Sequence, residues 1–255
     1  RTARGTAMVN VLPLEADEKV TAVVVTREFH EEEYLMMVTA FGTVKRIPFI
    51  ALKTNRKTGI RAVTLEEGDH LVNVIRTQGN DNIILATRQG MAICFNENDV
   101  RPMGRDAMGV KGITLTGDDR VIGAQKAEEG LTLLTVTEKG YGKRTDLNDE
   151  NGEAIYRITN RGAKGVKTMN LTDKTGNLIG LEAVTDEQDL MLITKSGTAI
   201  RMAMDTIRIM GRATQGVKLI ELQKRNDTLM FGCVVPKEEV EEATEATTEE
   251  TTTEE

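Results

Sequence analysis

Most of the chain alternates short apolar runs with polar turns. Near its middle, apolar runs at residues 110–115, 121–124 and 131–137 are separated by Gly, Asp and Glu, and a turn at 138–140 leads into a fourth run at 141–145. Val, Ile, Leu and Thr dominate these runs, which are four to seven residues long. Such runs predict β-strands, and no window carries the long amphipathic stripe of a helix. The pattern predicts an all-β fold.

The strand pattern is organised by an internal repeat. A motif of Arg, three residues and Gly-Val-Lys occurs at 105–111, 161–167 and 212–218, with looser copies at 56–65 and 1–12. The glycines of the last four copies, at positions 59, 109, 165 and 216, are 50, 56 and 51 residues apart. A second marker, Thr-x-x-Gly, ends at positions 42, 90, 140 and 197, with spacings of 48, 50 and 57. Two markers that keep one period indicate a repeated structural unit.

Four strands in about 50 residues, repeated, predict a propeller-like ring of four-stranded antiparallel blades. We predict one domain over residues 1–236, with about five units at 1–53, 54–103, 104–158, 159–210 and a partial 211–236. Residues 238–255 contain nine Glu and no Lys or Arg, whereas the whole chain has a net charge of −7, so the remainder is slightly basic at +2. We expect residues 237–255 to be a disordered acidic tail, which could compete with an anionic ligand for the basic part.

The sequence offers no catalytic or metal-binding constellation. His30 and His70 lie in polar segments, and neither has a second ligand at metal-site spacing. Cys94 and Cys233 are far apart, without a C-x-x-C motif, and are predicted to be buried thiols of a reducing compartment. Residues 146–152 only loosely match a calcium loop and are interpreted as an insertion. The sequence therefore argues against an enzyme.

Positive charge recurs at fixed phases of the repeat. Each unit has an Arg before its Gly-Val-Lys motif, and most units have a second Arg or Lys within that motif. The strand after the Thr-x-x-Gly turn carries further Arg and Lys residues, except in the second unit, which has Cys94-Phe95 at that place. Residues at one phase of a ring lie on one rim, so these bases predict a belt that neutralises a curved phosphate backbone without reading bases. The predicted belt comprises Lys45, Arg46, Arg56, Arg61, Arg105, Lys111, Lys143, Arg144, Arg161, Lys167, Arg201, Arg212 and Lys218.

Two other interpretations of these bases remain open. The side chains could cover solvated strand faces, with the Arg residues tying adjacent units together, or the ring could be a protein-binding scaffold. Aromatic residues make up only 3% of the chain and Trp is absent, so platforms for stacking single-stranded bases are scarce. Duplex DNA, bound without sequence specificity, is the ligand that the pattern favours.

Several segments together resemble the C-terminal DNA-wrapping domain of the DNA gyrase A subunit. They include Glu138-Lys-Gly-Tyr-Gly-Lys-Arg-Thr145, Arg161-Gly-Ala-Lys-Gly165, Leu190-Met-Leu-Ile-Thr194 and 211–218, in the order of the family, and the likeness spans 1–236. The family's marker, Q-R-R-G-G-K-G, has only a partial echo at 159–165, in which Arg161, Gly162, Lys164 and Gly165 match. The chain begins with Arg, so we expect it to be a piece of a longer protein that holds the marker.

The resemblance implies a six-bladed β-pinwheel whose blades exchange a strand with their neighbours. It implies that the ligand is duplex DNA and that Arg161, Gly162, Lys164 and Gly165 are among the residues that contact the wrapped DNA. The implied assembly is an A2B2 complex, in which a dimer of gyrase A chains joins gyrase B, in the bacterial cytoplasm at the nucleoid, with no membrane. ATP and Mg would serve other parts of that complex, and this chain would hold no cofactor. The equivalent domain of topoisomerase IV is the related alternative.

Overall fold

The computed structural model describes residues 5–7, 10–15, 18–56, 58–222 and 227–237, and within them it contains β-strands and short 3-10 helices. The predicted acidic tail, apart from Lys237, lies outside the described residues. The first seven strands are β1 (Tyr34–Thr39), β2 (Thr43–Pro48), β3 (Leu71–Thr77), β4 (Asn82–Thr87), β5 (Met91–Asn96), β6 (Val110–Lys111) and β7 (Val121–Lys126). The others are β8 (Thr132–Thr137), β9 (Tyr141–Asp146), β10 (Val166–Lys167), β11 (Leu178–Val184), β12 (Gln188–Thr194), β13 (Ala199–Ala203), β14 (Val217–Lys218) and β15 (Leu229–Pro236). The 3-10 helices η2 (Phe49–Leu52), η3 (Glu97–Asp99) and η4 (Met204–Thr206) each follow the second strand of a hairpin.

The strands form four antiparallel sheets, which we number blades 1 to 4 along the chain. Their strand orders are β3-β1-β2-β6, β7-β4-β5-β10, β11-β8-β9-β14 and β15-β12-β13. Each blade is built on a tight hairpin whose turn carries the Thr-x-x-Gly marker, and the glycines of these turns, such as Gly42 and Gly140, have φ of +84° and +82°. The all-β fold with antiparallel blades is confirmed.

Successive units exchange a strand. The two-residue strands β6, β10 and β14 carry the Val-Lys of the repeat motif, and each pairs with the preceding blade, through β2, β5 and β9 respectively. The chain then returns to add β7, β11 and β15 to its own hairpin. Each of the first three blades therefore contains strands from two successive units. The exchange implied by the family resemblance is confirmed.

In the described residues, three buried clusters lie between blades, and another covers the outer face of blade 1, where Leu35, Met37 and Ile47 pack with residues of the connecting segments. Met36 and Val38 of blade 1 pack with Ile83 and Phe95 of blade 2 in one buried cluster. A second cluster joins blades 2 and 3, and a third joins blades 3 and 4. Because neighbouring blades cover both faces of each inner blade, the inner blades leave only strand edges and connecting segments for solvent and ligands.

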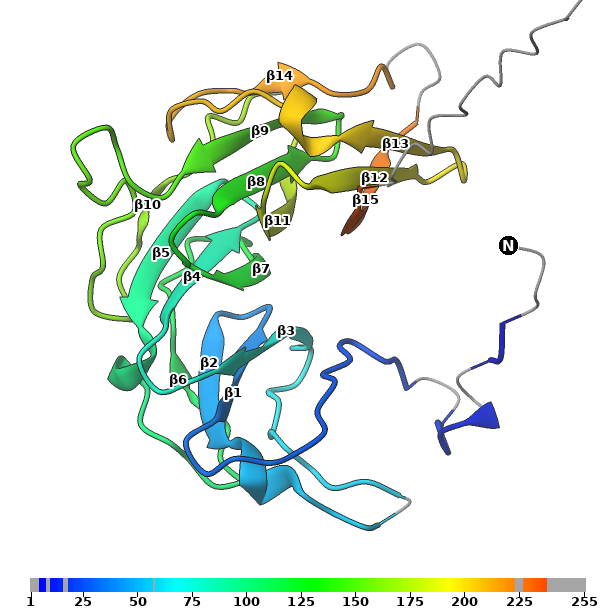
Figure 1. Ribbon diagram of the computed structural model, residues 1–255, viewed down its shortest axis with the longest axis vertical. Coiled ribbons are helices and arrows are strands. Elements are labelled where there is room, and N and C mark those ends of the chain that lie inside the picture. Colours follow the sequence, from blue (N-terminus) through cyan, green and yellow to red (C-terminus); the bar gives the residue numbers. More distant parts are fainter. Residues whose placement is uncertain (1–4, 8–9, 16–17, 57, 223–226, 238–255) are drawn as a thin grey trace, which may run out of the picture.

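The blades follow an arc around a common centre (Figure 1). The strands β3, β7, β11 and β15 form the inner edges, where β7 contacts both β3 and β11. The exchanged strands β6, β10 and β14 lie on the convex side, at the outer edges of their sheets (Figure 1). The repeat motif therefore lies on the perimeter of the arc.

Two expectations differ from the structure. The sequence predicts about five units, but the described residues form four sheets. The described residues before Tyr34 contribute no strand, and the exchanged strand of each later unit completes the sheet of the preceding blade. Cys94 is buried as predicted, whereas Cys233 is exposed, because blade 4 has no further blade against the face on which this thiol lies.

Candidate nucleic-acid interface

The convex edge carries three equivalent stretches of chain, residues 101–114, 157–170 and 208–218, which run along the outer edges of blades 1, 2 and 3. Together with residues 58–64, which bond to the first of these stretches, we call them the perimeter segments. Each of the three equivalent stretches first meets the second strand of its blade through a parallel bridge, at Pro102, Ile158 and Ile209, and then forms the exchanged strand. Backbone hydrogen bonding therefore fixes the position of these segments.

The motif glycine lets each of the last three segments approach the blade closely. Gly109, Gly165 and Gly216 have φ of +115°, +74° and +78°, which L side chains rarely adopt. A Cβ would lie 2.6 Å from the Val44 carbonyl oxygen at Gly109 and 2.7 Å from that of Gly142 at Gly216, and the approach at Gly165 is closer still. This explains the recurrence of glycine at this phase.

Adjacent perimeter segments also bond to one another. The Thr64 hydroxyl donates to the Asp106 carbonyl (3.1 Å), the Thr114 hydroxyl donates to that of Gly162 (2.6 Å), and the Asn170 N–H donates to that of Thr214 (3.0 Å). The Gly162 N–H adds a bond to the Gly112 carbonyl (2.7 Å). The four segments thus form one continuous run.

Most bases on this run face solvent. Of the predicted residues, the exposed ones on or next to this run are Arg56, Arg61, Arg105, Lys111, Lys164, Lys167 and Lys218. Arg161 and Arg212 are half-buried, because their guanidinium groups donate to the Lys111 carbonyl (3.0 Å) and the Lys167 carbonyl (2.7 Å) of the preceding segment. Gly162 and Gly165 shape the segment that carries Lys164. These residues are brought together as a positively charged strip.

The predicted strand lysines are not on this strip. Lys45 is 1% exposed, and its ammonium donates to the carbonyls of Ala62, Arg105 and Ala107 at 2.7–2.8 Å. Burial lowers its pKa, with Asp106 acting in the opposite direction. The prediction that Lys45 lies on the DNA-facing rim is therefore wrong, because the segments that contain Ala62 and Arg105–Ala107 cover it on the outer face of blade 1.

Lys143 is the counterpart of Lys45 in blade 3. It is fully buried, and its ammonium donates to the carbonyls of Gly211 (2.8 Å) and Arg212 (2.6 Å) and to the Thr214 hydroxyl (3.2 Å). Burial, reinforced by the Arg212 charge, lowers its pKa to about 8. Lys143 supports a perimeter segment from beneath, which corrects its assignment to the rim.

The strand arginines Arg46 and Arg144 are buried as well. Arg46 forms an ion pair with Glu97 (3.0 Å) and stacks over the Tyr34 ring. Arg144 forms an ion pair with Asp186 and donates to the Ile207 carbonyl (2.9 Å). These side chains tie adjacent blades together, so the structural interpretation of the bases is correct here and the belt interpretation is wrong.

Two more predicted residues are bound to carboxylates. Arg201 of blade 4 pairs with Asp189 (2.7 Å) and donates to the Pro236 carbonyl (2.9 Å), which holds it on the blade. Lys218 lies on the perimeter but pairs with Glu221 (2.6 Å), and the hydrogen bond to that carboxylate raises its pKa. Arg201 is exposed but lies on β13 of blade 4, away from the perimeter segments, so its role in binding DNA stays a prediction.

Blade 2 lacks the buried bases. The turn glycines align Ile93 and Cys94 with Lys45 and Arg46, one position earlier than the Cys94-Phe95 pair expected from the sequence. Cys94 is far smaller than Arg, and cavities of about 250 and 280 Å³ border it and Tyr156. Burial raises the pKa of the Cys94 thiol to about 11, so the thiol is neutral at physiological pH.

Sequence reasoning missed three bases on the perimeter. Arg101, Arg157 and Arg208 are exposed, and each stands four residues before the motif arginine of its unit. Their common phase, followed by Pro102, Ile158 and Ile209, is visible in the sequence as Arg-Pro/Ile-x-x-Arg. With them, the strip has one more cation on each of its last three segments.

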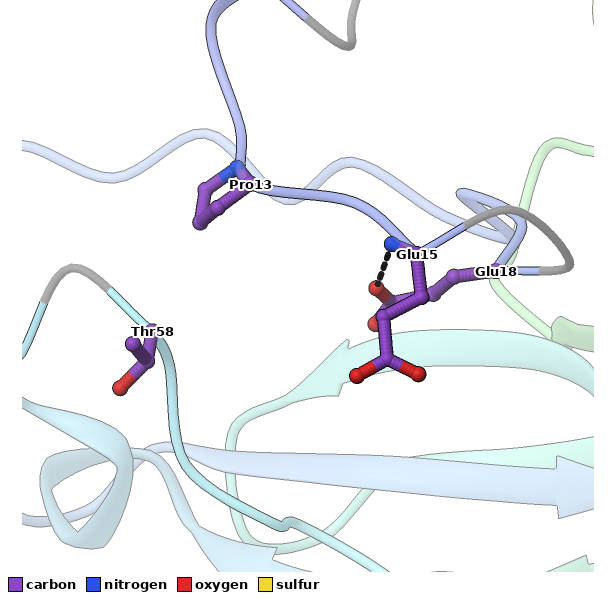
Figure 2. Close-up of a pocket in the computed structure, with 4 residues that line it drawn as sticks. All are labelled: Pro13, Glu15, Glu18 and Thr58. Carbon is purple, nitrogen blue, oxygen red and sulfur yellow. Dashed lines mark hydrogen bonds between the residues drawn. The ribbon is translucent and has the colours of Figure 1, made fainter.

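A separate hollow lies near the N-terminal segment. It has a volume of about 550 Å³ and is lined by Pro13, Glu15, Glu18 and Thr58. Figure 2 shows the carboxylates of Glu15 and Glu18 on one side of it, with the Glu15 N–H donating to Glu18 (3.2 Å). The charges of Glu15 and Glu18 repel a phosphate group, so this hollow is not included in the candidate DNA interface, although Thr58 belongs to the first perimeter segment.

Within the described residues, no group of His, Cys, Asp or Glu side chains is arranged to hold a metal ion. In the same part of the chain, no helix is long and apolar enough to cross a membrane.

Comparisons with known proteins identify relatives. The family described as "DNA gyrase C-terminal domain, beta-propeller" matches residues 33–78, 81–128, 132–185 and 188–231, one match for each blade. The DNA gyrase A subunit of Lawsonia intracellularis is 42% identical over 225 residues, which is 87% of this chain and 27% of that protein. The corresponding gyrase protein of Ureaplasma parvum is 40% identical over 227 residues, covering 89% of this chain and 26% of that protein. The chain thus spans about a quarter of these relatives.

Solved structures share the fold. The C-terminal domain of a DNA topoisomerase IV superposes with a TM-score of 0.82 at 22% identity, over 91% of this chain and 71% of that one. A DNA gyrase A C-terminal domain superposes with a TM-score of 0.76 at 24% identity, over 91% and 75%. With four family matches covering the four blades, and relatives at 40–42% identity, the chain belongs to the DNA gyrase C-terminal domain family.

Proposed function

We propose that this chain binds and wraps duplex DNA along its perimeter segments, without reading the base sequence. The supporting observation is the continuous, hydrogen-bonded run of segments on the convex edge, with exposed Arg and Lys side chains at repeated phases. Cations fixed along a curved edge match a bent phosphate backbone. The strip lies on strand edges and connections, with no helix to enter a major groove, which supports binding without sequence specificity.

The wrapping would serve a larger enzyme. We propose that the chain is the non-catalytic C-terminal part of a DNA gyrase A protein, acting with the rest of a gyrase A dimer and with gyrase B in ATP-dependent negative supercoiling. Relatives at 40–42% identity are gyrase proteins, which favours gyrase over topoisomerase IV although the fold likeness extends to both. By itself the chain would neither cleave DNA nor hydrolyse ATP, and the cofactors would belong to other parts of the complex.

Wrapping is tested by linking number. Nicked plasmid is incubated with the protein, sealed with ligase and deproteinised, and its topoisomers are resolved. Smoothly bending 20–30 base pairs by 40–90° costs about 1–6 kcal/mol, which many phosphate contacts must offset. We expect a shift that grows with protein concentration; no shift at saturating protein would exclude wrapping.

The competing function, a protein-binding scaffold, predicts a different salt dependence. If about 6–10 phosphates are contacted, affinity for duplex should fall about 10³–10⁵-fold between 50 and 200 mM salt. A scaffold would retain its partner in high salt and would not retain DNA.

A further inference from the structure

Blade 2 has a cysteine where the other three blades have an arginine. Arg46, Cys94, Arg144 and Arg201 each stand four residues after the turn glycine of their hairpin. In blades 1 and 3 this arginine is buried and ties its blade to the next one. In blade 2 a cavity of about 250 Å³ borders Cys94 instead.

The backbone around Cys94 has the same arrangement as the backbone around the arginines of blades 1 and 3. The Thr159 N–H donates to the Cys94 carbonyl at 2.9 Å, and the Met103 and Met210 N–H groups donate to the two arginine carbonyls at 2.8 Å. A parallel bridge to the perimeter segment forms at all three places. The three blades therefore differ here in the side chain and not in the course of the chain.

The cavity wall contains the counterparts of the groups that bind those arginines. The blade 1 arginine donates to the Asn98 side chain (2.9 Å), and Asn148, which stands like Asn98 eight residues after its turn glycine, lines the cavity. The blade 3 arginine pairs with Asp186, and Glu129, which stands like Asp186 eleven residues before its turn glycine, lines the cavity as well. The cavity therefore has the amide and the carboxylate that receive a guanidinium group in blades 1 and 3.

Charge favours a cation in this cavity rather than in the second one beside Cys94. The second cavity, of about 280 Å³, is lined by Arg157 and Lys164, which would repel a cation. In the first cavity the charged lining residue is Glu129, and Tyr156 adds an aromatic ring to the wall. A guanidinium group stacks favourably on such a ring and binds a carboxylate through two parallel N–H groups.

We propose that the cavity lined by Cys94, Glu129, Asn148 and Tyr156 binds the guanidinium group of a ligand, in the position that a strand arginine fills in blades 1 and 3. The ligand is an alkylguanidinium, either a small molecule or the side chain of an arginine in another protein. A volume of about 250 Å³ admits this head group with a short alkyl chain, whereas drug-sized ligands need larger pockets. The bound group would join blades 2 and 3. This inference does not depend on DNA binding.

The test measures the melting temperature of the full chain with ethylguanidinium chloride or ethylammonium chloride at constant ionic strength. At ten times its dissociation constant, ethylguanidinium should raise the melting temperature by roughly 3 °C. Ethylammonium at the same concentration should have a much smaller effect, because a primary ammonium cannot bind a carboxylate through a planar pair of N–H groups. Equilibrium dialysis gives the dissociation constant directly.

Three variants locate the binding. Glu129→Gln removes the carboxylate, and Glu67→Gln is the matched control, an exposed carboxylate outside the cavity. We expect the dissociation constant for ethylguanidinium to rise about tenfold in Glu129→Gln and to stay unchanged in Glu67→Gln. Cys94→Arg supplies the guanidinium from the chain itself and should abolish the response. If Cys94→Arg does not fold, the comparison of the two glutamine variants decides.

An arginine derivative distinguishes the two sources of the ligand. If acetylarginine amide binds as tightly as ethylguanidinium, the cavity admits an arginine side chain of another protein; if it is excluded, the ligand is a small molecule. The inference is overturned if ethylguanidinium and ethylammonium shift the melting temperature equally, or if Glu129→Gln binds ethylguanidinium as the unsubstituted protein does. A cavity that serves only to hold water predicts both of those results. Because no DNA is present, failure of the proposed function and failure of this inference are seen in separate experiments.

Discussion

The strand bases and the perimeter bases are the same residue types in the same repeat, yet their surroundings are opposite. Lys143 is fully buried and donates to three oxygen atoms of the 208–218 segment above it, whereas Lys111 is exposed on the 101–114 segment. Two neighbouring blades cover the faces of an inner strand, so even a charged side chain there must find protein partners. The edge segments have a free side, and their charges remain available to a ligand.

Because of this difference, we expect the same substitution to lower stability at a buried lysine and to weaken DNA binding at an exposed one, and the loss of stability should be the larger effect. Lys143→Met keeps the length of the side chain but leaves the Gly211 and Arg212 carbonyls without their donor, so the free energy of unfolding should fall by about 3 kcal/mol. Lys111→Met should change it by less than about 0.5 kcal/mol while weakening duplex binding. Urea denaturation and fluorescence anisotropy measure the two quantities. Equal destabilisation by the two substitutions would abolish the distinction.

The same comparison predicts a pH dependence. The pKa of Lys143 is about 8 in the folded protein, below its ordinary value of 10.5. Between these two values the unfolded chain binds more protons at this residue than the folded one, so stability should rise with pH. We expect a gain of about 2 kcal/mol from pH 7 to pH 10 that the Lys143→Met variant lacks. Denaturation of both proteins across this range measures the difference, and parallel curves would argue against a buried ammonium.

Much of the architecture could be predicted from the sequence, because glycine turns and strand-length apolar runs are local signals. The apolar run at 110–115 predicts a strand, and β6 lies at its first two residues, but the pairing of β6 with the preceding blade joins residues far apart in the sequence and has no local signal. The misassigned bases have a physical cause. Lys45 and Arg46 are adjacent in a strand, so they point to opposite faces of blade 1. Blade 2 covers Arg46 and the connecting segments cover Lys45, and neither form of cover has a local signal in the sequence. Arg101, Arg157 and Arg208 share a phase that is readable in the repeat, but they lie outside the glycine motif that defines the predicted belt.

The central claim, that perimeter bases contact DNA phosphates, is tested most directly by the salt dependence of duplex binding. The informative variant combines Lys111→Ala, Lys164→Ala and Lys167→Ala, and its control combines Lys19→Ala, Lys139→Ala and Lys195→Ala, which are also exposed. Each lost phosphate contact lowers the slope of log K against log salt by about 0.9. We predict a slope smaller by about 3 for the perimeter variant and an unchanged slope for the control. Equal slopes for the two variants would contradict the claim.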